Sequence, residues 1–197
     1  MKPILIVAGS VVVLAVLIYL YIVTTNSDNN KASIELARTV TLFETGNYQE
    51  AINGKKGTNI MGFKQIVDTY GSTEYGEIAK VYLANSYFYL GKLEEAYKTY
   101  DDYSGSDDMY KAAALAGVAG YYESKNELEK AADKFKEAAY ISNENASNPQ
   151  YLYEAAIIYI KLNQKAEAKE LLDKIKEEYK TSDVMREIEK YAALVKE

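Results

Sequence analysis

The sequence predicts an all-α fold built from repeated helical hairpins. Three observations carry this prediction. A set of landmark residues recurs along the chain, the 197 residues contain only two prolines, and one long uncharged apolar run stands near the N-terminus. Each landmark set consists of a small residue, a Gly or Asn five positions before it and, in most copies, a large apolar residue four positions after it. The pattern is typical of two antiparallel helices joined by a tight turn.

Each landmark has a physical role. A Gly or Asn just past a helix end can adopt a positive φ and close that helix. The small residue lets the second helix approach the first, and the aromatics fill the space between hairpins. The alanines follow one another at intervals of 45, 35 and 37 residues. The sets are Gly46, Ala51 and Lys55, a degenerate copy; Gly91, Ala96 and Tyr100; Asn126, Ala131 and Phe135; and Asn163, Ala168 and Leu172.

These landmarks and intervals resemble the tetratricopeptide repeat, which has a period of about 34 residues. The resemblance implies a helical-hairpin solenoid, and an ordinary helical bundle with coincidental spacing is the alternative. We expect a transmembrane anchor over residues 1–23, a linker over 24–31, and about four repeats over 32–182. The degenerate first repeat carries an insertion at 53–62. An amphipathic segment at 183–197 is expected to cap the array, since solenoids need a polar outer face at their ends.

The apolar run Ile4–Val23 has 20 residues without a charge, enough to span a bilayer as a helix. Tyr19 and Tyr21 lie at its far end, where interfacial aromatics are expected. A cleaved signal peptide is the alternative, although no small-residue cleavage pattern follows the run. The few flanking charges give a mild preference for an N-terminus inside and repeats outside the cytoplasm.

A single anchor followed directly by such repeats resembles the ancillary subunit of the bacterial Sec translocon and related envelope repeat proteins. This resemblance implies a single-pass protein of the bacterial inner membrane with its repeats in the periplasm. It implies protein partners: a translocon, a chaperone or another membrane complex.

The composition bears on catalysis and on nucleic acid. The chain has no histidine and no cysteine, which removes the commonest general base, the commonest metal ligands and the thiol nucleophile. We therefore predict no enzymatic activity, cofactor, metal site or small-molecule substrate. A net charge of −6 argues against nucleic acid as a partner. Neither the glycine-flanked loop at 54–57 nor the acidic loop at 101–108 has the residue spacing that a phosphate loop or a calcium loop requires.

Tetratricopeptide arrays bind partners through the groove lined by the first helix of each repeat, so the resemblance implies a groove here too. The predicted function is a membrane-anchored protein–protein interaction scaffold of the cell envelope, linked to protein export or envelope assembly. The alternative is a permanent structural or accessory subunit of a large membrane complex. The expected groove residues are Val81, Asn85, Phe88 and Tyr89 in the second repeat, Ala116, Gly120 and Glu123 in the third, and Tyr153, Ile157, Ile160 and Lys161 in the fourth.

Overall fold

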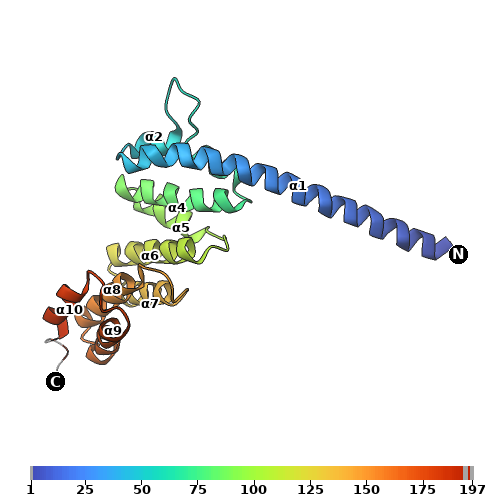
Figure 1. Cartoon of the computed structure of the whole chain (residues 1–197). Helices are drawn as coiled ribbons and strands as arrows, with labels where there is room; N and C mark the ends of the chain where they lie inside the picture. The colour runs from blue at the N-terminus through green and yellow to red at the C-terminus, as the bar shows by residue number, and fades with distance from the viewer. Residues whose placement is uncertain (1, 193–194, 196–197) are drawn as a thin grey trace. The chain divides into compact units, whose positions relative to one another are not determined.

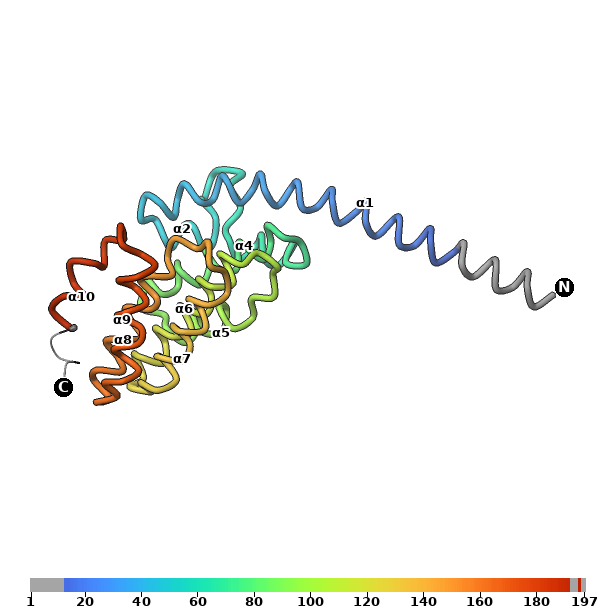
Figure 2. Tube along the Cα trace, turned by 60° about the horizontal axis from the view of Figure 1, so that its bottom comes forward, coloured from blue at the N-terminus to red at the C-terminus, as the bar shows by residue number. Residues whose placement is uncertain are grey.

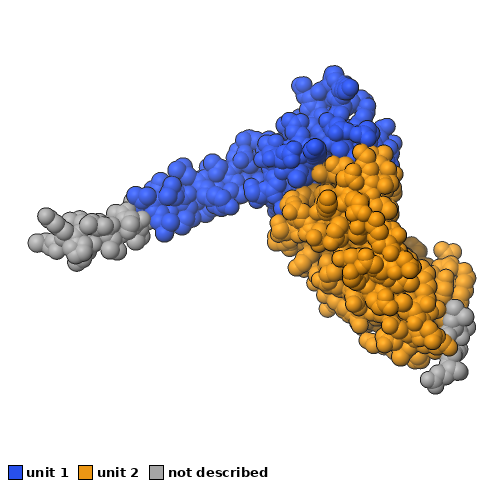
Figure 3. All heavy atoms as spheres, turned by 180° about the vertical axis from the view of Figure 1, so that it is seen from behind, with its two compact units in different colours: residues 1–79 blue, residues 80–197 orange. Residues whose placement is uncertain are grey.

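The computed structural model describes the backbone of residues 2–192 and 195, and the side chains of 13–191 and 195. The chain divides into two compact units, residues 1–79 and residues 80–197 (Figure 3). Within the described residues all regular structure is helical (Figure 1). The helices are α1 (Lys2–Glu44), α2 (Tyr48–Asn53), α3 (Phe63–Tyr70), α4 (Glu74–Tyr89), α5 (Leu93–Asp101), α6 (Asp108–Ser124), α7 (Leu128–Ala139), α8 (Asn148–Lys161), α9 (Lys165–Glu178) and α10 (Met185–Ala192).

The first unit is dominated by α1, which runs without a break for 43 residues. The linker expected over 24–31 is therefore wrong, because this stretch is helical. Local polar contacts support the helix there. The Thr24 hydroxyl donates to the Leu20 carbonyl at 2.9 Å, and Lys31 forms an ion pair with Asp28 one turn earlier, also at 2.9 Å. Polar residues that look like a linker in sequence can thus continue a helix that is propagated from both sides.

The predicted anchor, Ile4–Val23, lies at the start of α1. Among the described residues, no helix combines enough length and apolar character to cross a membrane. The side chains of residues 4–12, nearly half of the apolar run, lie outside those that the structure describes. The side chains of residues 13–24 are all exposed, whichever face of the helix they lie on. The anchor remains a prediction.

The second half of α1 packs against α2 and α3. Leu36, Leu42, Ile52, Phe63 and Ile66 are buried apolar residues of this hairpin. The buried Thr39 hydroxyl ties the helix to the end of the insertion by donating to the Met61 carbonyl at 2.6 Å. The residues from Gly54 to Gly62 form no helix, so the predicted insertion interrupts the second helix of the first repeat.

The second unit consists of successive antiparallel helices that pack in chain order. Each helix from α5 to α9 contacts the one that follows it (Figure 2). One buried cluster joins α4, α5 and α6 around Val81, Tyr100 and Val118. A larger cluster joins α6 to α10 around Leu152, Leu172 and Ile188. Val184, Ile188 and Val195 are buried, as the amphipathic pattern of the capping segment predicts.

The turns between paired helices confirm the first landmark. Gly46, Gly91, Asn126 and Asn163 have φ values of 77°, 72°, 59° and 59°. In each turn the next residue donates its amide proton back to a carbonyl five positions earlier, which closes the helix in a Schellman motif. These bonds join Asn47 to Leu42, Lys92 to Tyr87, Glu127 to Tyr122 and Gln164 to Tyr159, at 2.8–2.9 Å.

This turn geometry predicts a stability effect at Gly91. A Gly91→Ala change is expected to lower the free energy of unfolding by about 1 kcal/mol, because an L-residue is strained at positive φ. Nothing lies within 4 Å of the added Cβ, so the effect is purely conformational. Gly120→Ala is the matched control, since Gly120 lies in a helix with equally open space. It should raise stability by about 0.5–1 kcal/mol. Urea unfolding of both variants checks this, and equal signs would contradict it.

Candidate functional site

A hollow opens in the second unit between side chains of α4, α6 and α8. Its volume is about 350 Å³. We call it the aromatic groove, and it is lined by Asn85, Phe88 and Tyr89 of α4, Ala113, Ala116, Gly117 and Gly120 of α6, Tyr151 of α8, and Tyr100 and Phe135 of α5 and α7. None of these side chains carries a charge at neutral pH. The groove therefore suits an uncharged, largely apolar ligand surface.

Small residues of α6 form one wall of the groove. An added Cβ on Gly120 would meet nothing within 4 Å, so the groove is open at this point. A Cβ on Gly117, one turn earlier, would overlap the Tyr100 ring. The absence of a side chain at Gly117 thus makes room for the Tyr100 ring. The space beside Gly120 is not filled by the protein and is open to a ligand.

Two aromatic side chains stand exposed at the α4 wall. Phe88 is 46% and Tyr89 58% exposed, and their rings meet edge to face with centroids 6.0 Å apart. Two adjacent exposed aromatic residues beside a groove form an apolar surface, and aromatic residues are enriched at the centres of protein–protein interfaces.

Asn85 supplies the oriented polar group of the groove. Tyr100, which is only 6% exposed, donates its hydroxyl proton to Asn85 Oδ1 at 2.5 Å. This bond fixes the amide and uses its acceptor, so the Asn85 Nδ2 donors are available to a ligand. Within the described part of the chain, no acceptor is bonded to that nitrogen. A carbonyl oxygen of a partner's backbone matches this donor.

Two buried tyrosines of the groove, Tyr100 and Tyr151, have raised pKa values. Burial raises the pKa of Tyr100 far above its usual range, and the nearby Tyr89 and Tyr151 hydroxyls add to the shift. Burial also raises the pKa of Tyr151. At neutral pH the Tyr100 and Tyr151 hydroxyls are therefore uncharged and can act as hydrogen-bond donors and acceptors.

Raised tyrosine pKa values predict alkaline instability. Burial raises the pKa of Tyr159 to about 12, with a further contribution from Asp133. Burial, followed by the hydrogen bond with Tyr191, raises the pKa of Tyr153 to about 12. The folded state holds these protons more tightly than the unfolded state. The stabilisation is therefore complete below about pH 10 and is lost as the pH rises toward 12.

Urea midpoints measured between about pH 8 and pH 11.5 should fall steadily above pH 10. A Tyr153→Phe, Tyr159→Phe double variant should show a smaller fall, because two of the groups that titrate are gone. A midpoint that stays constant across this range would contradict the assignment.

The expected groove residues divide into those that line the groove and those that do not. Asn85, Phe88, Tyr89, Ala116 and Gly120 line it. Five residues that the sequence pattern does not single out as groove positions also line it: Tyr100, Ala113, Gly117, Phe135 and Tyr151. Phe135 and the lining residue Tyr100 are landmarks expected to fill the space between helices, so their periodicity is the available signal.

The remaining expected residues have other roles. Val81 is 2% exposed and belongs to the core with Tyr100 and Val118. Glu123 and Lys161 form an ion pair at 2.9 Å between α6 and α8. Tyr153 packs edge to face on Tyr191, with centroids 5.9 Å apart. The half-buried Ile157 and Ile160 are not among the lining residues.

Some expected residues do not line the groove because it crosses the helices obliquely. Asn85, Gly120 and Ile157 occupy equivalent positions, eleven residues before the landmark alanine. Only the first two line the groove. In α8 the lining residue is Tyr151, six positions before Ile157 and near the start of the helix. Counting back eleven residues from the landmark alanine therefore does not identify the lining residue of the fourth repeat.

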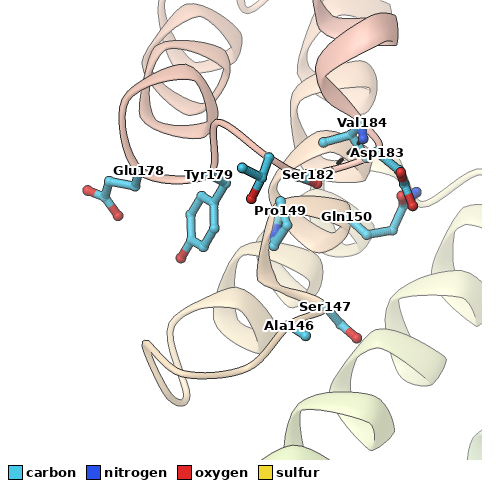
Figure 4. Close-up of a pocket in the computed structure, with 10 residues that line it drawn as sticks. Ala146, Ser147, Pro149, Gln150, Glu178, Tyr179, Ser182, Asp183 and Val184 are labelled. Carbon is cyan, nitrogen blue, oxygen red and sulfur yellow. Dashed lines mark hydrogen bonds between the residues drawn. The ribbon is translucent and has the colours of Figure 1, made fainter.

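A second hollow, of about 500 Å³, lies between the start of α8 and the connection from α9 to α10 (Figure 4). Its carboxylates, Glu178 and Asp183, lie on opposite sides of the close-up and do not form an acid pair. The other lining residues are Ser147, Thr181 and Ser182 with small hydroxyl side chains, together with Ala146, Pro149, Gln150, Tyr179 and Val184. Across the described residues, no group of three or more acidic, His or Cys side chains could hold a metal ion.

Comparisons with known proteins agree with the repeat geometry. Residues 150–182 match the family model of the tetratricopeptide repeat. Two solved structures of nearly identical TPR-like repeats, assigned to a putative kinesin light chain of Podosopora anserina, are similar to this chain. One has 16% sequence identity and a TM-score of 0.57, over 85% of this chain and 94% of that one. The other, a variant of the same repeats with one substitution, has a TM-score of 0.58 at 16% identity, over 85% and 93%.

The chain is an all-helical, tetratricopeptide-like solenoid. No curated protein matches its sequence. At this level of identity the two structures establish the fold alone. The family match covers most of α8, all of α9 and the turn that contains Asn163.

Proposed function

We propose that this protein is a membrane-anchored, non-catalytic scaffold that binds an uncharged segment of a partner protein in the aromatic groove. The observation that carries the proposal is the groove itself. It joins exposed aromatics, an oriented amide donor and an open glycine on one face of a tetratricopeptide-like array. Repeats of this kind present extended concave binding surfaces.

The lining residues define the kind of segment that fits. Phe88, Tyr89 and Phe135 offer apolar contact area to a large side chain of the partner. Asn85 offers hydrogen-bond donors to a backbone carbonyl. Gly120 permits close approach of a main chain. Since the groove is uncharged, we expect affinity to depend little on salt.

The proposal includes an anchor over Ile4–Val23 in a bacterial inner membrane, with the repeats on the periplasmic side. Support comes from the 20-residue uncharged run and from the exposure of its residues 13–23. A role in protein export or envelope assembly would then place a translocon, a chaperone or another envelope complex among the partners.

Alkaline extraction of membranes tests the anchor. The expected result is that the full chain stays in the membrane pellet after alkaline extraction, and a chain without residues 1–23 is released.

Crosslinking of the tagged full-length chain in intact membranes, followed by mass spectrometry, tests the scaffold function. We expect partners in less than stoichiometric amounts, and their loss in a Gly120→Leu variant, whose added side chain would enter the open part of the groove. One protein present at constant stoichiometry in both variants would contradict this and favour the alternative, a fixed subunit of a membrane complex. Gly120→Ala serves as the control, because it adds only a methyl group.

The side of the membrane is tested separately. Because the chain has no cysteine, a single Lys56→Cys variant carries one thiol, on the exposed insertion loop. An impermeant maleimide should label it in intact cells with a permeable outer envelope. Labelling only after cell lysis would show that the repeats are cytoplasmic.

A further inference from the structure

The turn between α3 and α4, Tyr70–Tyr75, contacts α1 just beyond the apolar run. The Tyr75 backbone amide donates to Asn29 Oδ1 at 3.1 Å. Lys31 lies close enough to Tyr70 for a weak electrostatic interaction, and α3, the helix before the turn, packs against α1. These contacts fasten the turn to the part of α1 that immediately follows residues 13–23, within the first unit.

The turn is built rigidly. The buried Thr73 hydroxyl donates to the Tyr70 carbonyl at 2.8 Å and accepts from the Gly76 amide at 3.1 Å. A Cβ added to Gly76 would overlap the Tyr70 carbonyl oxygen, so the start of α4 lies directly against the end of α3. These contacts fix the conformation of the turn, and the bond from Tyr75 to Asn29 sets where the turn lies along α1.

The rise per residue of an α-helix gives the height of Asn29 above the hydrocarbon layer, if that layer ends at Val23. Asn29 follows Val23 by six residues, which is about 9 Å of helix. The headgroup layer on each side of the hydrocarbon is about 5–8 Å thick, so Asn29 lies at the outer edge of that layer. The insertion loop, by contrast, meets α1 at Thr39, about 24 Å of helix beyond Val23. A typical tilt of about 20° changes these heights little.

We propose that the Tyr70–Tyr75 turn is a membrane-contacting surface that lies at the outer edge of the phospholipid headgroup layer. This inference rests on the proposed anchor. The turn is fastened to α1 by the contacts above, so insertion of the apolar run brings the turn to the bilayer surface. Its half-buried tyrosines, Tyr70 and Tyr75, have the amphipathic character that interfaces favour.

The charges near the turn select the kind of lipid. Glu74 lies in the turn, Asp68 lies just before it, and the nearby Lys31 is already paired with Asp28. The excess is negative, which disfavours anionic lipids and matches the ammonium group of a zwitterionic headgroup. The surface thus fits phosphatidylcholine or phosphatidylethanolamine.

Depth measurement with nitroxide labels tests the inference, because single cysteines are unambiguous in a chain that has none. Three exposed positions are replaced one at a time in the full chain: Leu17→Cys, Ser72→Cys and Lys56→Cys. Each labelled variant is reconstituted in phosphatidylcholine vesicles, and its accessibility to oxygen and to an aqueous nickel complex is compared. We expect the label at 17 in the hydrocarbon, the label at 72 at headgroup depth, and the label at 56 in water.

The outcomes separate the two proposals. A label at 17 in the hydrocarbon, together with a label at 72 as water-accessible as the one at 56, overturns the headgroup contact and leaves the anchor standing. A label at 17 outside the hydrocarbon overturns both. A label at 72 that moves deeper in vesicles with anionic lipid than in phosphatidylcholine alone contradicts the zwitterionic preference.

Discussion

A Gly117→Ala substitution is expected to lower the free energy of unfolding of the second unit by about 1–3 kcal/mol, the usual cost of overpacking a core. The new methyl group would overlap the Tyr100 ring. That ring is buried and held by its hydrogen bond to Asn85, so it cannot turn aside without losing the bond. Urea unfolding monitored by circular dichroism measures the effect.

Gly120→Ala is the control for this experiment, because it makes the same change in the same helix with open space around the methyl group. A double variant, Gly117→Ala with Tyr100→Leu, should be more stable than the sum of the two single changes predicts, since each removes the other's conflict. If Gly117→Ala proved as stable as Gly120→Ala, the packing of Tyr100 against α6 would be wrong.

A Phe88→Ala substitution is expected to weaken partner binding by about 30-fold or more, which corresponds to about 2 kcal/mol at an interface hot spot. Because Phe88 is exposed and lines the groove, its removal should leave the fold intact. The measurement is binding of the full chain to a synthetic peptide of the crosslinked partner segment, by fluorescence anisotropy.

Tyr140→Ala is the matched control, because Tyr140 is an aromatic residue of similar exposure, 45%, that does not line the groove. Its removal should change the affinity less than about twofold, as expected for a residue outside the contact. Equal losses in the two variants would mean that the partner does not contact the groove. Unchanged unfolding midpoints in both would exclude a folding defect as the cause.

Local features of the fold could be predicted from sequence because their causes are local. A Gly or Asn at a fixed distance from a small residue is enough to indicate a positive-φ turn, and Gly46, Gly91, Asn126 and Asn163 all adopt one. The insertion at 53–62 followed from the longer interval between alanines, together with a cluster of glycines.

The groove depends on how the hairpins are arranged in space, so it was predicted only in part. Most expected residues of the second and third repeats, Asn85 and Gly120 among them, do line it. Those of the fourth do not, because the hollow runs obliquely and reaches α8 near Tyr151. The predicted linker over residues 24–31 was wrong for another reason. Polar residues 24–31 lie between two strongly helical stretches, and their composition alone does not show that the helix continues.

Site-specific photocrosslinking tests the central proposal, partner binding in the aromatic groove, most directly. A benzophenone amino acid is placed at Phe88 or, as the control, at Tyr140, in the full chain in its native membrane. We predict that a partner peptide crosslinks to position 88 and not to position 140, and that Gly120→Leu abolishes the crosslink. Crosslinking that is equal at both positions, or unaffected by Gly120→Leu, would contradict binding in the groove.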